Sequence, residues 1–154
     1  MKRLLILLSL ALVAWAAPLQ AQSGGLATFA TETLSIETAA GDDHAFEVEI
    51  AETPDQRAQG LMFRRQLAVD GGMLFLFGRA EERAMWMKNT LIPLDMLFID
   101  ETGKIVRIEE RTVPHSLKAI LSGGPVSAVL ELNAGTASRL IIKPGDQVRH
   151  PAFK

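Results

Sequence analysis

A short run in the middle of the chain, residues 85–98, carries polar side chains inside otherwise apolar sequence. Its chemically useful groups are the indole of Trp86, the ammonium of Lys88, the amide of Asn89, the hydroxyl of Thr90 and the carboxyl of Asp95. Polar groups in apolar sequence are expected to be at least partly buried, and buried polar groups need partners. The run therefore predicts either a structural hydrogen-bond network or a site that receives a ligand.

The direction in which these side chains point depends on the backbone. In an extended segment alternate residues share a face, so residues 85–90 would present Trp86, Lys88 and Thr90 together. Four residues separate Thr90 from Asp95, which is short enough for the Asp95 carboxyl to fold back toward the polar run.

A second carboxyl group, that of Glu131, lies in another apolar stretch and shares a strand face with Val129. We therefore expect Asp95, Glu131 and Lys88 to be drawn into the same apolar layer. The two carboxyls are the candidates for an acid–base pair, provided that their surroundings drive their pKa values apart. The same groups could instead form a buried ion pair that fixes strand register, and such pairs are not reliably stabilising.

A helix predicted to begin near residue 54 would place Arg57, Gly60 and Arg64 on one line, at positions i, i+3 and i+7. Two guanidinium groups flanking bare backbone could hold a carboxylate or a phosphate, and the alternative is a solvated charged face. The residues that we predict to bind a ligand are Arg64, Trp86, Lys88, Asn89, Thr90, Asp95 and Glu131.

Several kinds of chemistry are excluded by the residue types. The chain has no cysteine, which excludes thiol redox chemistry, iron–sulfur clusters and zinc–thiolate sites. Its three histidines do not fall in a metal-ligand spacing, and no motif for a serine nucleophile or a phosphate loop is present. Met85 and Met87 could bind copper(I) through their thioethers or simply fill the core. We predict no metal and no cofactor.

The elements that must position these residues are short strands and two helices. Alternating or continuous apolar patterns predict strands at residues 33–38, 45–51, 73–77, 94–100, 104–113, 126–132 and 147–150. Thr53 can cap a helix and close a capping box with Gln56, and a second short helix is expected at 134–142. Residues 78–84 and 114–125 are expected to be connections. The pattern predicts an α+β fold, a small, mostly antiparallel, curled or barrel-like sheet with two short helices.

The first residues have the pattern of a secretory signal peptide, in which Lys2 and Arg3 precede an apolar run too short for a comfortable membrane span. We expect cleavage after Ala21, a flexible leader at 22–31 and one α+β domain at 32–154, in the periplasm or secreted. Loss of two of the 16 basic residues leaves 14 against 18 acidic ones. Because the mature chain is mildly acidic, we expect no nucleic-acid partner. We also expect no transmembrane segment in the mature chain.

Several blocks, in order along the chain, resemble one known family. They are residues 59–64 (QGLMFR), 72–77 (GMLFLF), 86–90 (WMKNT), 93–95 (PLD), 129–131 (VLE) and 145–146 (GD). Together they resemble the family called domain of unknown function 192, over roughly residues 45–150. Met85 stands where that family commonly has an aromatic residue, and Gly78 where it often has proline.

The resemblance implies a small β-rich α+β domain that is often exported, and it implies no reaction. It also implies a shared polar set, without roles, that comprises Arg64, Trp86, Lys88, Asn89, Asp95 and Glu131.

Three functions are compatible with this sequence. The first is a periplasmic domain that binds a small polar or anionic ligand or a peptide segment. The second is a hydrolase or lyase that acts on an envelope saccharide or peptide through Asp95 or Glu131. The third is a structural accessory protein of envelope assembly, in which the polar set is architectural.

Overall fold

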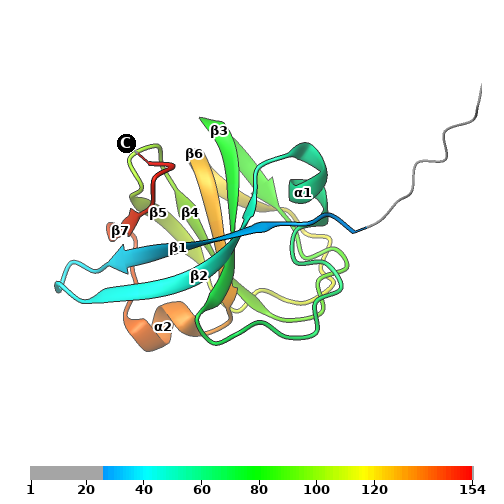
Figure 1. The fold of residues 1–154 in the computed structure, drawn as a ribbon, viewed down its shortest axis with the longest axis horizontal. Helices are drawn as coiled ribbons and strands as arrows, with labels where there is room; N and C mark the ends of the chain where they lie inside the picture. Colours follow the sequence, from blue (N-terminus) through cyan, green and yellow to red (C-terminus); the bar gives the residue numbers. More distant parts are fainter. Residues whose placement is uncertain (1–25, 154) are drawn as a thin grey trace, which may run out of the picture.

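The computed structural model describes residues 26–153, so the predicted signal peptide lies outside the described residues. The described chain forms seven strands and two short helices (Figure 1). In chain order these are β1 (Ala30–Glu37), β2 (Asp43–Ala51), α1 (Pro54–Gln59), β3 (Gly71–Met85), β4 (Leu94–Ile99), β5 (Ile105–Glu109), β6 (Ile120–Asn133), α2 (Thr136–Leu140) and β7 (Gln147–Arg149). The predicted α+β fold is confirmed. No helix among the described residues is long and apolar enough to cross a membrane.

The strands form one curled sheet in the order β5-β4-β6-β3-β2-β1-β7. Its pairings are antiparallel except for β2 with β3, which are parallel and joined through α1. The two ends of the order approach each other, because Ile105 N donates to Asp146 O (2.9 Å) and Val148 N donates to Gly103 O (2.8 Å). The sheet is therefore closed on itself at that corner, as the curled pattern predicted.

Two hydrophobic cores lie on the two faces of this sheet. The inner core draws side chains from every strand, among them Leu34, Val48, Leu74, Leu97, Leu130 and Val148. The outer core lies on the other face of β3, β4 and β6, and includes Leu61, Met73, Phe75, Met87, Met96, Phe98 and Val129. Because successive strand residues point to opposite faces, each central strand serves both cores.

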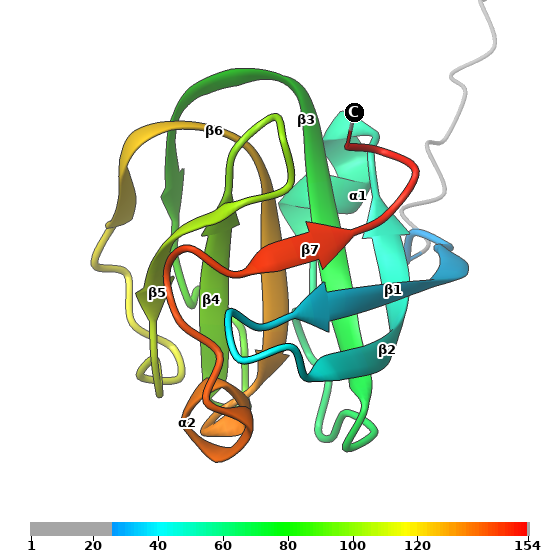
Figure 2. The same ribbon diagram turned by 90° about the vertical axis from the view of Figure 1, so that its left-hand side faces the viewer.

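Strand β3, with 15 residues, is more than twice as long as a typical strand and bends into an arch that β6 follows (Figure 2). Residues 78–84 and 120–125, predicted to be connections, are strand residues of this arch, in β3 and β6. Gly78 takes a positive φ of 81° at the bend, and the β3–β6 register shifts between Leu76 and Glu81. The sequence did not indicate a strand here because its charged side chains, which form ion pairs such as Arg79–Glu81 (2.8 Å), face solvent and lack an apolar pattern.

Helix α1 begins where the sequence predicted it, but it ends at Gln59, before Arg64. Thr53 and Gln56 form the expected capping box. The helix stops at Gly60, whose φ of 48° and ψ of −138° suit glycine, and whose added Cβ would lie 2.9 Å from Cζ of Phe75. Arg64 therefore lies beyond the helix, and the predicted line of Arg57, Gly60 and Arg64 on one helix is wrong.

We predict that Gly60→Ala lowers the free energy of unfolding by about 1–3 kcal/mol, because alanine strains the positive φ and crowds Phe75. Gly124→Ala is the matched control, since a Cβ there meets nothing within 4 Å. Urea denaturation of both variants measures the difference. Equal stability of the two variants would contradict this account of the helix end.

Candidate functional site

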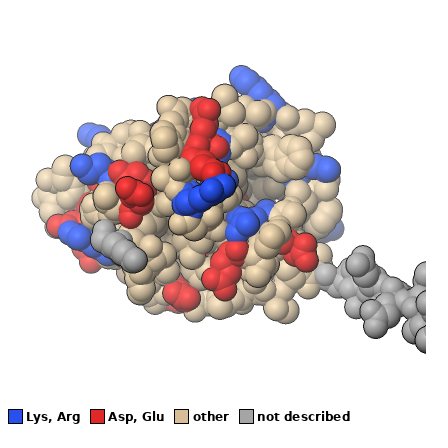
Figure 3. Space-filling view, turned by 90° about the horizontal axis from the view of Figure 1, so that it is seen from above, with Lys and Arg blue, Asp and Glu red and all other residues tan. Residues whose placement is uncertain are grey.

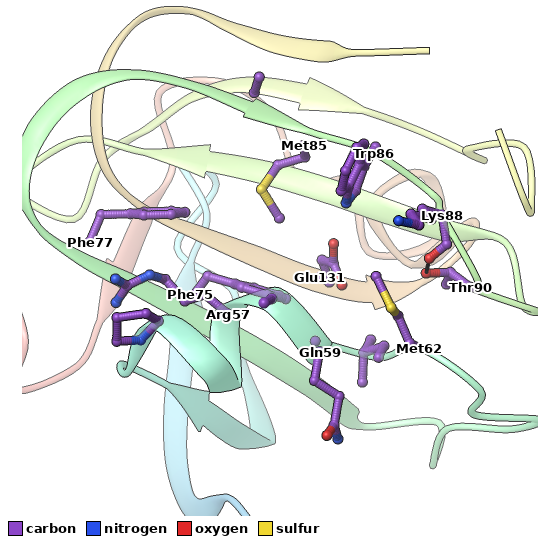
Figure 4. A pocket seen from close by; sticks show the side chains of 15 residues that line it. Arg57, Gln59, Met62, Phe75, Phe77, Met85, Trp86, Lys88, Thr90 and Glu131 are labelled. Carbon is purple, nitrogen blue, oxygen red and sulfur yellow. Dashed lines mark hydrogen bonds between the residues drawn. The ribbon is translucent and has the colours of Figure 1, made fainter. Parts of the chain in front are cut away.

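A cavity of about 360 Å³ lies between helix α1 with the turn that follows it and the arch of β3 (Figure 4). That volume is within the range of small-molecule sites. The lining residues are Pro54, Arg57, Ala58, Gln59, Gly60, Leu61, Met62, Phe75, Phe77, Ala84, Met85, Trp86, Lys88, Thr90 and Glu131. The cavity thus joins the outer core to the surface.

Glu131 lies at the back of this cavity. Its strand position pairs with Met73 of β3 and Met96 of β4, both fully buried, and only 5 % of Glu131 is exposed. No hydrogen bond or ion pair of its carboxyl is found within residues 26–153. Burial disfavours the charged form and raises the pKa of Glu131 to about 8. The carboxyl is therefore mostly protonated at neutral pH, with a hydrogen-bond donor unused by the protein.

Trp86 and Lys88 form the rim of the cavity. The Trp86 side chain is half exposed, and Lys88 Nζ lies 5.3 Å from the centroid of its ring. Figure 4 shows the Glu131 carboxyl facing the space beneath Trp86, with Lys88 beside it. The rim thus offers an aromatic face and an ammonium over a neutral carboxyl.

The segment that carries the rim ends in a turn at Lys88 and Asn89, where the sequence analysis expected residues 85–90 to be extended throughout. Thr90 N donates to Met87 O (3.1 Å), and Asn89 has a positive φ of 54°. Trp86, Lys88 and Thr90 nevertheless all line the cavity. Their expected convergence is found, with a different backbone geometry.

Arg57, which the sequence analysis named with Arg64 as a possible anion contact but did not include in the predicted binding set, lines the cavity from α1. Its Nη1 donates to Leu76 O (2.9 Å) and to Glu52 O, at the edge where β2 leaves the sheet. Its guanidinium also lies 5.6 Å from the centroid of Phe77. The sequence analysis did not predict the apolar walls, which include Phe75, Phe77 and Met62. An apolar residue in a cavity wall has the same sequence pattern as one in the core.

Asp95 does not reach this cavity. It pairs with Leu132, one position from the Met96–Glu131 pair, so the two carboxyls point to opposite faces of the sheet. Its oxygens accept hydrogen bonds from the backbone amides of Arg111 (2.9 Å), Gly135 (3.0 Å) and Ala137 (2.9 Å). The expectation that both carboxyls share one apolar layer is therefore wrong, and Asp95 anchors the start of α2.

Arg64 and Asn89 also lie outside the cavity lining. Arg64 forms an ion pair with Glu49 (2.6 Å), a residue of β2. Asn89 Nδ2 contacts Met62 Sδ (3.8 Å), and Asn89 O accepts from Phe63 N (2.9 Å). Both residues therefore hold the turn that forms one wall, and ligand contact by either one stays a prediction.

The two methionines considered for copper occupy different places. Met85 lines the cavity, whereas Met87 is fully buried and its Sδ accepts a hydrogen bond from Thr112 Oγ1 (3.2 Å). Within residues 26–153, no three His, Asp or Glu side chains are grouped so that they could hold a metal ion.

Comparison with known proteins places these features in a family. The profile of domain of unknown function 192, described as an uncharacterized ACR, matches residues 35–150. A proposed transcription regulator from Sinorhizobium meliloti 1021 has a crystal structure with 51 % identity and a TM-score of 0.81, over 84 % of this chain and all of that one. A protein of unknown function from Novosphingobium aromaticivorans DSM 12444 shares 38 % identity and a TM-score of 0.76, over 88 % of this chain and 94 % of that one. No curated protein matches the chain.

We predict that Asp95→Asn lowers the free energy of unfolding by about 2–4 kcal/mol, because the substitution turns a charge-assisted acceptor of three amides into a partial donor. Chemical denaturation measures the loss. Asp42→Asn, on the exposed turn between β1 and β2, is the control. A stability unchanged by Asp95→Asn would contradict the anchoring role.

We predict that stability falls as pH rises from about 5 to 8, by up to about 1.4 kcal/mol per pH unit from Glu131 alone. The sign follows because the raised pKa of Glu131 makes the folded chain keep a proton that the unfolded chain loses above its ordinary value of 4.5. Glu131→Gln mimics the protonated form and should lack this contribution. Urea titrations of both proteins at several pH values test it, and parallel pH profiles would refute it.

Proposed function

The chain belongs to the domain of unknown function 192 family, and we propose that it is an exported domain that binds a small molecule in the cavity between α1 and the β3 arch. Export is proposed from the N-terminal pattern of a basic start, an apolar run and small residues before residue 22. The ligand-binding part of the proposal is independent of the location and is supported by the cavity itself.

The observation that carries the proposal is the Glu131 carboxyl. Because no protein group within residues 26–153 bonds to this 5 %-exposed carboxyl, its hydrogen bonds are left to water or to a ligand that enters the cavity. Its carboxyl faces a cavity that opens to solvent. A bound molecule that hydrogen bonds to Glu131 would replace water at this low-dielectric position, where such a bond is strong.

The rim supplies the other elements of recognition. Trp86 offers a half-exposed face for stacking, and Lys88 has no acidic partner within ion-pair distance among the described residues. Cavities that bind small molecules commonly combine such apolar walls with a few converging polar groups. The arrangement therefore supports binding of a molecule with one polar end and an apolar body.

A general-acid enzyme is the second candidate, favoured by the pKa of Glu131 near 8. A buried acid that holds its proton at neutral pH could protonate a leaving group of an envelope saccharide or peptide. Asp95 cannot serve as the second carboxyl of such a pair, because it faces the opposite side of the sheet. The reaction would have to use Glu131 with Lys88 instead.

We do not propose DNA binding for this chain, although the Sinorhizobium relative is described as a proposed transcription regulator. The two helices described are six and five residues long, shorter than a recognition helix needs to be. The face seen from above shows acidic and basic side chains interspersed, not one basic surface (Figure 3).

Trp86 makes the ligand-binding proposal measurable by fluorescence. The chain has no tyrosine and two tryptophans, so in the full-length Trp15→Phe protein all tryptophan emission comes from Trp86. We predict a saturable change in this emission with at least one member of a panel of small carboxylates, phosphates, saccharides and short peptides. Lys88→Met should weaken that binding about tenfold, the effect of losing one charged contact.

Lys118→Met is the matched control, because Lys118 is exposed on a loop and does not line the cavity. Thermal unfolding checks that each variant stays folded. A panel with no effect on a folded protein, or binding that Lys88→Met leaves intact, would contradict the proposal. For the enzyme candidate, turnover of an envelope fragment should stop in folded Glu131→Gln.

A further inference from the structure

We infer that the ligand of this cavity is an amphipathic monoanion, a carboxylate with an apolar or aromatic body, whose carboxylate lies between the Glu131 carboxyl and the Lys88 ammonium. The inference rests on the proposed function and names its ligand class. It is carried by the charges that face the cavity, the state of the carboxyl at its back and the character of its walls.

The charges facing the cavity favour an anion. Its lining contains three ionisable side chains, Arg57 from α1, Lys88 from the rim turn and Glu131 from β6. Arg57 Nη1 is already used by two backbone carbonyls, whereas Lys88 rests on Trp86 without an acidic partner among the described residues. With Glu131 neutral the lining carries two positive charges, which attract an anion and oppose a cation.

The buried carboxyl favours an acceptor. Glu131 is flanked across the sheet by Met73 and Met96, so ionising it there is costly. A ligand ammonium would favour that costly ionised form, whereas a ligand carboxylate accepts the proton of neutral Glu131 in a hydrogen bond. Charge-assisted O–H···O⁻ bonds of this kind are short and strong.

The walls favour a ligand whose remainder is apolar. Phe75, Phe77, Met62 and Met85 line the space around the polar end. A saccharide would bring many hydroxyls against these side chains with few partners, and a phosphate dianion would need more free donors than Lys88 and Glu131 provide. A single carboxylate on a compact hydrocarbon or aromatic body matches both the polar end and a volume of about 360 Å³.

Binding of a carboxylate should be coupled to proton uptake and therefore depend on pH. The pKa of Glu131, about 8 in the free protein, should rise when a carboxylate binds, because the two groups then share one proton. Binding therefore takes up a fraction of a proton near pH 8, and above it affinity falls about tenfold per pH unit. A cationic ligand would release a proton and bind more tightly as pH rises.

The test uses the full-length Trp15→Phe protein with four benzyl-sized probes: phenylacetate, the neutral isostere phenylacetamide, benzylamine and phenyl phosphate. Kd values come from Trp86 emission between pH 6 and 9, and calorimetry in buffers of different ionisation enthalpy counts protons. We expect phenylacetate to bind at least tenfold more tightly than phenylacetamide at pH 6, with proton uptake near pH 8. Hexanoate should also bind, because the body need only be apolar.

Two variants separate the contributions. Glu131→Gln should bind phenylacetate more weakly at pH 6, because an amide is the weaker donor, and its Kd should not change between pH 7 and 9. Lys88→Met should weaken phenylacetate binding and leave phenylacetamide binding unchanged, with Lys118→Met as control. Thermal unfolding confirms that each protein is folded.

The failure of this inference is distinguishable from failure of the proposed function. Tighter binding of benzylamine with proton release, preference for phenyl phosphate, or equal binding of phenylacetate and phenylacetamide would overturn the anion assignment and leave a small-molecule site in place. If neither these probes nor the broader panel perturbs Trp86 in the folded protein, the inference and the proposed function both fall.

Discussion

The burial of one carboxyl among apolar side chains is the constraint on which the site depends. Glu131 lies on the outer face of β6 between buried methionines of β3 and β4, where no protein group within residues 26–153 bonds to it. A charge there would be strongly disfavoured, so the group stays protonated and its pKa rises to about 8. The neighbouring positions on β3 and β4 carry only apolar side chains of the outer core, so Glu131 is the polar exception on this face.

The fold treats its two buried carboxyls in opposite ways. Asp95 faces one side of the sheet and accepts three backbone hydrogen bonds, which fix the start of α2. Glu131 faces the other side, where the β3 arch and the glycine at the end of α1 leave a cavity instead of a partner. The amides of the chain satisfy one carboxyl, and we propose that a bound molecule satisfies the other.

Much of the fold could be predicted from sequence, because its signals are local. The capping box of Thr53 and Gln56 predicted the start of α1, and the apolar patterns predicted most of the strands. The β3 arch could not be predicted, since the charged residues around Glu81 look like a loop until β6 is beside them. The site was predictable in part: Trp86, Lys88, Thr90 and Glu131 line one cavity. Asp95 was assigned to the wrong layer because strand register, a non-local property, decides which face a residue occupies.

The most direct test of the account is a ¹³C NMR titration of the Glu131 side-chain carboxyl in the free protein, assigned by its loss in Glu131→Gln. We predict a titration midpoint of about 8, with the carboxyl protonated at pH 6. A midpoint near the ordinary value of 4.5 would mean that the carboxyl is ionised and solvated, and would contradict the central claim.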